Sequence, residues 1–211
     1  MPSHVLSSED AKQRVVEAVR AVESRSSLEL VVCVRGRSDA YREVPVIVGA
    51  ALAFITLAFL LFSPWSFPLA AFLTDVAVAF AVGALIARRS RRLTRLFTTA
   101  ARRREAVDHA ARATFYDQGV LRTTGRTGLL LFVSLGEREL RLIPDVGVPV
   151  EAIGGGLLDI EAALTAALRG RGNLGAFVEA TEGLGPLCAD LLPRAEDDVN
   201  ELSDEVVTHD G

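Results

Sequence analysis

Residues Arg126 to Pro149 read RTGLLLFVSLGERELRLIPDVGVP, and this stretch decides the fold. Leu129 to Val133 is a continuous apolar run, long enough for a strand that is buried on both faces and too short for a lone core helix. After a turn at Gly136, polar and apolar residues alternate from Glu139 to Leu142, which predicts a second strand with one face in water. We therefore expect a β-hairpin here.

Asp145 follows the second strand directly, after Pro144 has ended the ladder by removing a donor. Aspartates at such corners often form turns by bonding a nearby backbone N–H, and functional acids also occur at strand ends. Both interpretations of Asp145 stay open at this point.

Two apolar segments, Val44–Phe62 and Leu69–Ala87, concentrate the hydrophobic residues of a chain whose mean hydropathy is +0.31. A helix of 19 residues rises about 28 Å, against about 30 Å of bilayer hydrocarbon, so each segment can span a membrane. The connector Ser63–Pro68 is too short to hold a domain. Residues 44–87 are therefore predicted to form a transmembrane helical hairpin rather than two buried core helices.

Asp75 is the only charged residue in the two apolar segments. An acid inside a membrane span is often functional. The first segment offers no basic or acidic partner for it, so we favour a structural role in which the carboxylate meets water near the membrane surface.

Arginines set the expected orientation of the hairpin, because basic residues flank both segments and are missing from the connector. By the positive-inside rule, both flanks and both termini are cytoplasmic, as in an integral protein of the inner or plasma membrane. Each arginine near the surface contributes about 1 kcal/mol of attraction to anionic headgroups. We therefore expect the lipid bilayer and its anionic headgroups, and not nucleic acid, as the partner of Arg88, Arg89, Arg91, Arg92 and Arg95.

The remaining patterns predict one discontinuous α/β domain from residues 1–43 and 88–193. The expected order is helix, strand, two spans, helix, two strands and two helices. Neither flank has the elements of a complete α/β layer, so the flanks should combine into one small α/β/α sandwich interrupted by the hairpin. The glycines at 154–156 are expected to unwind the chain before the next helix, and residues 194–211 form an acidic tail that either folds back or stays in water.

Several common chemistries have no support in the sequence. Cys33 and Cys188 form no CxxC pair, and the three histidines are scattered, which argues against a zinc site. No GxGxxG follows an expected strand, and the motifs GxxxxGK[ST], GxSxG and HExxH are missing from the sequence.

Four short motifs point to a known family: RTG at 126–128, the SLGER turn at 134–138, the aspartate-glycine corner at 145–147 and NELSD at 200–204. With these motifs the chain resembles the TPM-domain family, and within it the bacterial membrane proteins whose TPM domain is interrupted by a transmembrane hairpin. The similarity covers nearly the whole chain. Ser203 stands where the family pattern has proline, and GGGLLDI at 154–160 lacks the bulky aromatic that relatives carry near this helix start.

The resemblance implies a small α/β/α sandwich, with divalent-cation binding in some members, acid-phosphatase activity in others, and accessory roles in membrane-complex assembly or repair in still others. A calcium or magnesium site would use Asp145, with Glu151 and Asp159 nearby in the chain. A phosphatase would also need a nucleophile, and none is evident.

We therefore expect a membrane-anchored TPM-like binding or assembly module on the cytoplasmic face, whose partner is an unknown membrane or cytoplasmic protein. A metal-dependent phosphatase is the alternative.

Overall fold

The structure is a computed structural model that describes residues 6, 8–170, 173–194, 200–203 and 205–209 of the 211-residue chain. The chain divides into two compact units. The first is made of residues 1–39 and 104–211, and the second of residues 40–103. The second unit is therefore an insertion in the sequence of the first.

A four-stranded sheet in the order β3-β2-β1-β4 lies at the centre of the first unit. β1 (Glu29–Arg35) and β2 (Gly128–Ser134) pair in parallel over their whole length. β2 and β3 (Glu139–Pro144) form the antiparallel hairpin expected from the sequence, with Leu131 opposite Leu142. The two central strands are buried on both faces, which explains their continuous apolar runs.

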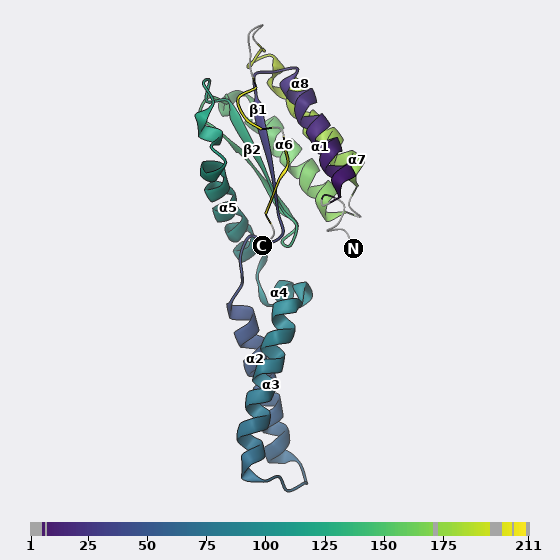
Figure 1. The fold of residues 1–211 in the computed structure, drawn as a ribbon, viewed down its shortest axis with the longest axis vertical. Helices are drawn as coiled ribbons and strands as arrows, with labels where there is room; N and C mark the ends of the chain where they lie inside the picture. The colour runs from purple at the N-terminus through teal and green to yellow at the C-terminus, as the bar shows by residue number, and fades with distance from the viewer. Residues whose placement is uncertain (1–5, 7, 171–172, 195–199, 204, 210–211) are drawn as a thin grey trace. The chain divides into compact units, whose positions relative to one another are not determined.

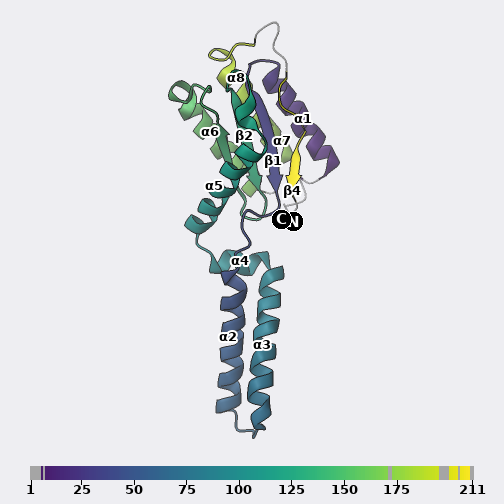
Figure 2. The ribbon, with the colours of Figure 1, turned by 60° about the vertical axis from the view of Figure 1, so that its left-hand side comes forward.

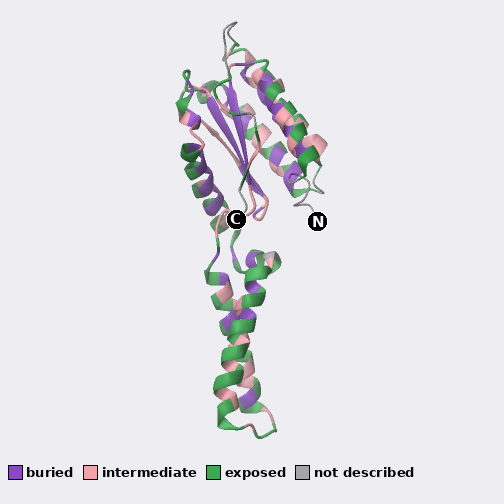
Figure 3. Ribbon diagram, in the orientation of Figure 1, coloured by how far each residue is buried: buried purple, intermediate pink, exposed green. Residues whose placement is uncertain are grey.

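Helices cover both faces of this sheet (Figure 1). Alternate residues of a strand point to opposite faces, so Leu30 and Val32 enter one core while Val31 and Cys33 enter the other. Figure 3 shows the buried residues gathered on the strands and on the helix sides that face them. The result is the α/β/α layering predicted from the sequence. One face carries α1 (Glu9–Glu23), α6 (Val150–Arg169), α7 (Leu174–Glu182) and α8 (Leu184–Ala189), and the other carries α5 (Ala100–Asp117), which a short 3-10 turn (Val120–Arg122) connects to β2.

A fourth strand, β4 (Val207–His209), pairs in parallel with β1 at the edge of the sheet (Figure 2). The sequence left open whether the acidic tail at 194–211 folds back or stays in water, and in the structure three of its residues join the sheet. Cys33 lies beside Val207 in this pairing, so the tail covers part of the free edge of β1. The tail acids at 196–198, 204 and 210 lie outside the described residues.

The glycines at 154–156 lie inside α6 instead of unwinding the chain before it. Helix packing is close at one of them, because a Cβ added to Gly156 would lie 2.4 Å from the Cδ1 atom of Leu187 in α8 and would force that side chain to shift. Gly155, in contrast, faces open space.

The second unit consists of a helical hairpin, α2 (Glu43–Phe62) and α3 (Leu69–Arg89), followed by the short helix α4 (Arg91–Phe97). The hairpin helices touch closely where a Cβ added to Gly83 would lie 3.0 Å from Gly49 Cα. Most apolar side chains point outward, since 22% of the most apolar part of α2 and 6% of that of α3 is buried. Both helices are long and apolar enough to cross a membrane.

The first unit should fold without the second. Replacing residues 40–103 by a flexible Gly/Ser linker is expected to give a soluble domain, because both cores of the first unit are made by residues outside that range. The measurement is a dispersed amide NMR spectrum with cooperative denaturant unfolding. In that background, Phe132→Ala should lower the free energy of unfolding by about 3–5 kcal/mol, since Phe132 is fully buried. A linker variant that aggregates or unfolds without cooperativity would contradict the expectation.

Candidate functional site

Asp145 lies at the corner between β3 and α6, and its carboxylate is bound by Arg126. The pair is bidentate, with Arg126 Nε donating to Oδ2 at 2.6 Å and Nη2 donating to Oδ1 at 2.8 Å. The backbone N–H of Val146 also donates to Oδ1, at 2.7 Å. The Asp145 side chain is 1% exposed. The hydrogen bond from Arg126 is the largest cause that lowers the pKa of the Asp145 carboxyl below its usual range, so the group is ionised at neutral pH.

The backbones of the same two segments are also joined. Gly128 O accepts from Asp145 N–H, and Arg126 O accepts from Gly147 N–H, both at 2.8 Å. A Cβ at Gly147 would lie 2.2 Å from Gly125 O, so this close approach requires glycine. The RTG and aspartate-glycine motifs therefore form one structural unit, which we call the Arg126–Asp145 corner.

The structure does not gather the predicted metal ligands into a cluster. Glu151 and Asp159 both lie on α6 with exposed side chains. Over the residues that the structure describes, no three His, Cys, Asp or Glu side chains are grouped so that they could hold a metal ion. To bind a cation, the Asp145 carboxylate would have to give up its hydrogen bonds to Arg126 and to the Val146 N–H. The calcium or magnesium site stays a prediction, whereas the contacts of Asp145 are those of a structural corner.

A buried polar network that the sequence analysis missed lies at the other end of β2. Ser134 Oγ donates to Glu137 Oε2, Ser38 N–H donates to the same oxygen at 3.2 Å, and Ser38 Oγ donates to Ser134 Oγ at 2.8 Å. Ser134 and Glu137 are both buried. The network ties the chain that leaves β1 to the β2–β3 turn. The signal in the sequence was weak, because serine and glutamate beside a glycine turn are ordinary surface residues.

Ion pairs cover the face of β3 that the sequence placed in water. Glu139 is buried beneath Arg169 of α6, and Arg141 pairs with Asp108 of α5. The alternation of polar and apolar residues predicted the strand correctly, but charged side chains from two flanking helices occupy its polar face.

The outer edge of β3 is also blunted. Leu142 N–H donates to Glu161 of α6 at 3.1 Å, and Arg141 donates to the carbonyl of Leu140 at 2.7 Å. Pro144 has no N–H to offer. A partner strand therefore finds few free backbone groups on this edge, which protects the sheet from edge-to-edge association.

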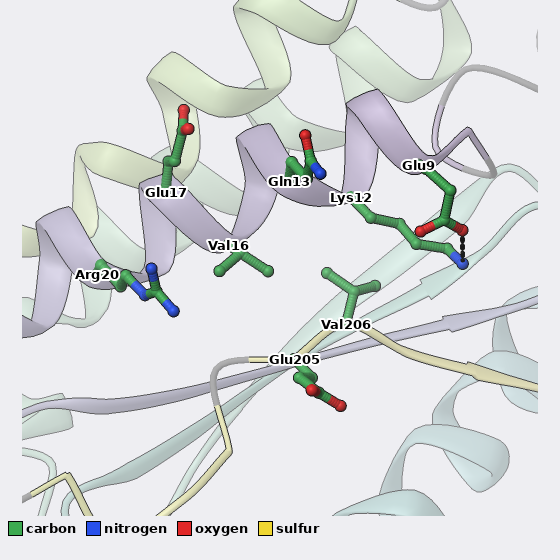
Figure 4. A pocket seen from close by; sticks show the side chains of 8 residues that line it. All are labelled: Glu9, Lys12, Gln13, Val16, Glu17, Arg20, Glu205 and Val206. Carbon is green, nitrogen blue, oxygen red and sulfur yellow. Dashed lines mark hydrogen bonds and ion pairs between the residues drawn. The ribbon is translucent and has the colours of Figure 1, made fainter.

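A groove of about 540 Å³ lies between α1 and the segment that leads into β4 (Figure 4). Val16 and Val206 point toward each other across it, and Lys12 is bound to Glu9. Its charged residues are of both signs, so it has no strong preference for an anion or a cation. The lining residues are Glu9, Lys12, Gln13, Val16, Glu17, Arg20, Glu205 and Val206.

The predicted membrane-surface arginines lie at the end of α3 and on α4. Arg88, Arg89, Arg92 and Arg95 are exposed, and Arg91 is the first residue of α4. Ser90 caps α4 by accepting from Leu93 N–H at 3.3 Å. Leu96 and Phe97 are exposed on this helix as well. The basic segment is therefore a short helix that presents both charged and apolar side chains to its surroundings.

Asp145→Asn should destabilise the protein, because it removes the charge that binds Arg126. The folded-state pKa of Asp145 is lower than its ordinary value of 3.8, so the stabilisation is fully present above that value and is lost as the pH falls through the folded-state pKa. The melting temperature of the variant should therefore lie below that of wild type at neutral pH, and the gap should close as the pH falls below 3.8 and through the folded-state pKa. Asp159→Asn, on the exposed face of α6, is the matched control and should melt like wild type.

Glu137→Ala should lower the free energy of unfolding by about 1–3 kcal/mol, because Ser134 Oγ and Ser38 N–H lose their shared acceptor. Glu17→Ala removes an exposed carboxylate from α1 and should stay within about 0.5 kcal/mol of wild type. Denaturant titration of the detergent-solubilised protein gives both values. Equal effects of the two substitutions would show that the network adds nothing.

Comparison with known proteins gives a match at the level of the fold. No protein-family model and no curated protein sequence matches the chain. Among solved structures, it is similar to the NMR structure of the BA42 protein from the psychrophilic bacterium Bizionia argentinensis, with a TM-score of 0.57. The two share 13% sequence identity, and the alignment covers 96% of this chain and 94% of that chain. At this identity the similarity shows the fold alone, and the protein therefore has an α/β fold of the kind seen in BA42.

Proposed function

We propose that this protein is a membrane-anchored, TPM-like binding or assembly module, held by the α2–α3 hairpin with its α/β domain on the cytoplasmic side. The proposal combines the outward apolar surface of the hairpin with the sequence resemblance to the TPM family. Its partner is a membrane or cytoplasmic protein.

The exposure of the hairpin carries the membrane part of the proposal. Phe54, Phe62 and Leu73 are each more than 70% exposed, and they belong to helices of 20 and 21 residues. A buried core helix would hide such residues from water, whereas a membrane span presents them to lipid. Helices of this length rise about 30 Å, which suits the hydrocarbon thickness.

The positions of the arginines support the proposed orientation of the hairpin in the membrane. Arg88 and Arg89 end α3, and α4 adds Arg92 and Arg95 beside the exposed Leu96. A helix with basic and apolar exposed residues suits the interface between anionic headgroups and acyl chains. The Ser63–Pro68 connector has no basic residue, so the positive-inside rule places it on the far side.

The α/β domain favours binding over catalysis in this proposal. The Asp145 carboxylate is held by Arg126, and the Ser134 hydroxyl donates to Glu137 with no histidine between them in the described network. The metal-dependent phosphatase has no observation in its favour.

Thiol labelling of intact cells tests the topology. In a background with Cys33→Ala and Cys188→Ala, a membrane-impermeant thiol reagent should label Ser66→Cys in the connector and should miss Ser203→Cys. After the cells are opened, both should react, since both positions are exposed. The reverse pattern in intact cells would refute the orientation. Release of the protein from membranes by alkaline carbonate would refute the membrane span itself.

A further inference from the structure

Asp75 places a carboxylate on the outward surface of α3. Its side chain is exposed, and no residue within the described part of the chain donates a hydrogen bond to it or forms an ion pair with it. It is also the only charge in residues 44–87. Within the part of the chain that the structure describes, the charge of Asp75 is therefore uncompensated.

If the proposed membrane span is correct, the unpaired charge of Asp75 lies inside the bilayer. At 1.5 Å per residue, Asp75 lies about 9 Å along the helix axis from Leu69, the first residue of α3. An aspartate side chain is too short to reach the interface from there as lysine and arginine do. The expectation from the sequence, that the carboxylate meets water near the surface, does not fit this depth. Charged groups within a bilayer are costly and are commonly paired with one another.

Asp75 belongs to a face of α3 that has the spacing of a helix-packing seam and is exposed from Asp75 to Arg89. Val78 is 60% exposed, Val82 44% and Leu85 52%. The buried residues of α3, Gly83 and Ala87, lie elsewhere on the helix. We call this the Asp75 face, and its residues follow one another at steps of four and three: Ala71, Asp75, Val78, Val82, Leu85 and Arg89.

We propose that the Asp75 face binds a transmembrane helix of a different membrane protein, and that a lysine or arginine of that helix pairs with Asp75. The small side chain of Ala71, one turn away, lets the backbone of a partner helix approach. Charge complementarity requires a cation about 9 Å inside the same membrane surface.

A second copy of this chain does not fit the Asp75 face. Residues 44–87 hold no basic side chain, so a second copy in the same orientation brings only another Asp75 to this depth. Two carboxylates side by side disfavour their charged forms. The inference therefore names the chemistry of the partner that the proposed function leaves open.

A defined probe tests the chemistry of recognition. The full-length protein and a synthetic leucine-alanine peptide of about 23 residues, long enough to span the bilayer, are reconstituted together in liposomes and their association is measured by FRET. One peptide carries a single lysine at the depth of Asp75, and the other carries leucine there. Wild type should bind the lysine peptide at least about tenfold more tightly, as expected for a paired charge within the bilayer.

Two variants locate the effect on Asp75. Asp75→Leu should abolish the preference for the lysine peptide. The double variant Thr74→Asp with Asp75→Thr keeps the composition of α3 and moves the acid about 100° around the helix, so it should lose the preference as well. Wild type and variants are first checked for resistance to extraction by alkaline carbonate. Release of wild type from the membrane would overturn the proposed membrane span. Normal insertion without a preference for the lysine peptide would overturn the pairing alone.

Photocrosslinking in the native host tests whether a partner protein contacts the Asp75 face. Benzoylphenylalanine at Val78 or Val82 should give one discrete adduct with another protein, and at Ala77 or Ala81, on other sides of α3, it should give none. The adduct should disappear with Asp75→Leu. Adducts from every position, adducts that persist without Asp75, or an adduct with the mass of two copies of this chain would overturn the proposal.

Discussion

The parallel pairing of β1 with β2 is the constraint on which the rest of the structure depends. The two strands match residue for residue, from Glu29 beside Gly128 to Arg35 beside Ser134. The whole second unit lies between them in sequence. Any insertion at this point must return the chain to the sheet, and a pair of antiparallel helices does so because both of its ends lie on one side. The two cores are assembled from alternate residues of these strands, so a register shift of one residue would exchange them.

Two polar clusters hold the ends of the β2–β3 hairpin. The Arg126–Asp145 corner fixes the start of β2 to the end of β3 through a bidentate ion pair and two backbone hydrogen bonds. At the other end, Glu137 accepts from Ser134 and Ser38 and so fixes the exit of β1. Both carboxylates are buried, and a buried carboxylate is tolerated because its oxygens accept several hydrogen bonds. The RTG, SLGER and aspartate-glycine motifs are thus accounted for by contacts within the fold.

The hairpin of the second unit has no comparable polar clusters among its described residues. Its helices meet through Gly49 and Gly83, which lets their backbones approach closely without polar contacts. The exposed surface of residues 44–87 is mostly apolar, and Asp75 is the only charged residue in that range. In the α/β domain the buried acids Asp145 and Glu137 have their partners within the chain, whereas Asp75 has none among the described residues. This difference sets the two units apart and supports the proposal that the second one serves as an anchor.

The sequence by itself determined β1, β2 and β3, the two long apolar helices and the layered α/β fold, because hydrophobic periodicity over five to twenty residues is a local property. It did not determine which partner each acid meets. Arg126 and Asp145 are distant along the chain and meet only because β2 and β3 are antiparallel. The sequence also did not show that β4 pairs with β1. Three residues carry too little pattern to predict a strand, and their conformation depends on a free strand edge elsewhere in the chain. Likewise, the close packing of Leu187 on Gly156 of α6 is a contact that exists only once the helices are assembled.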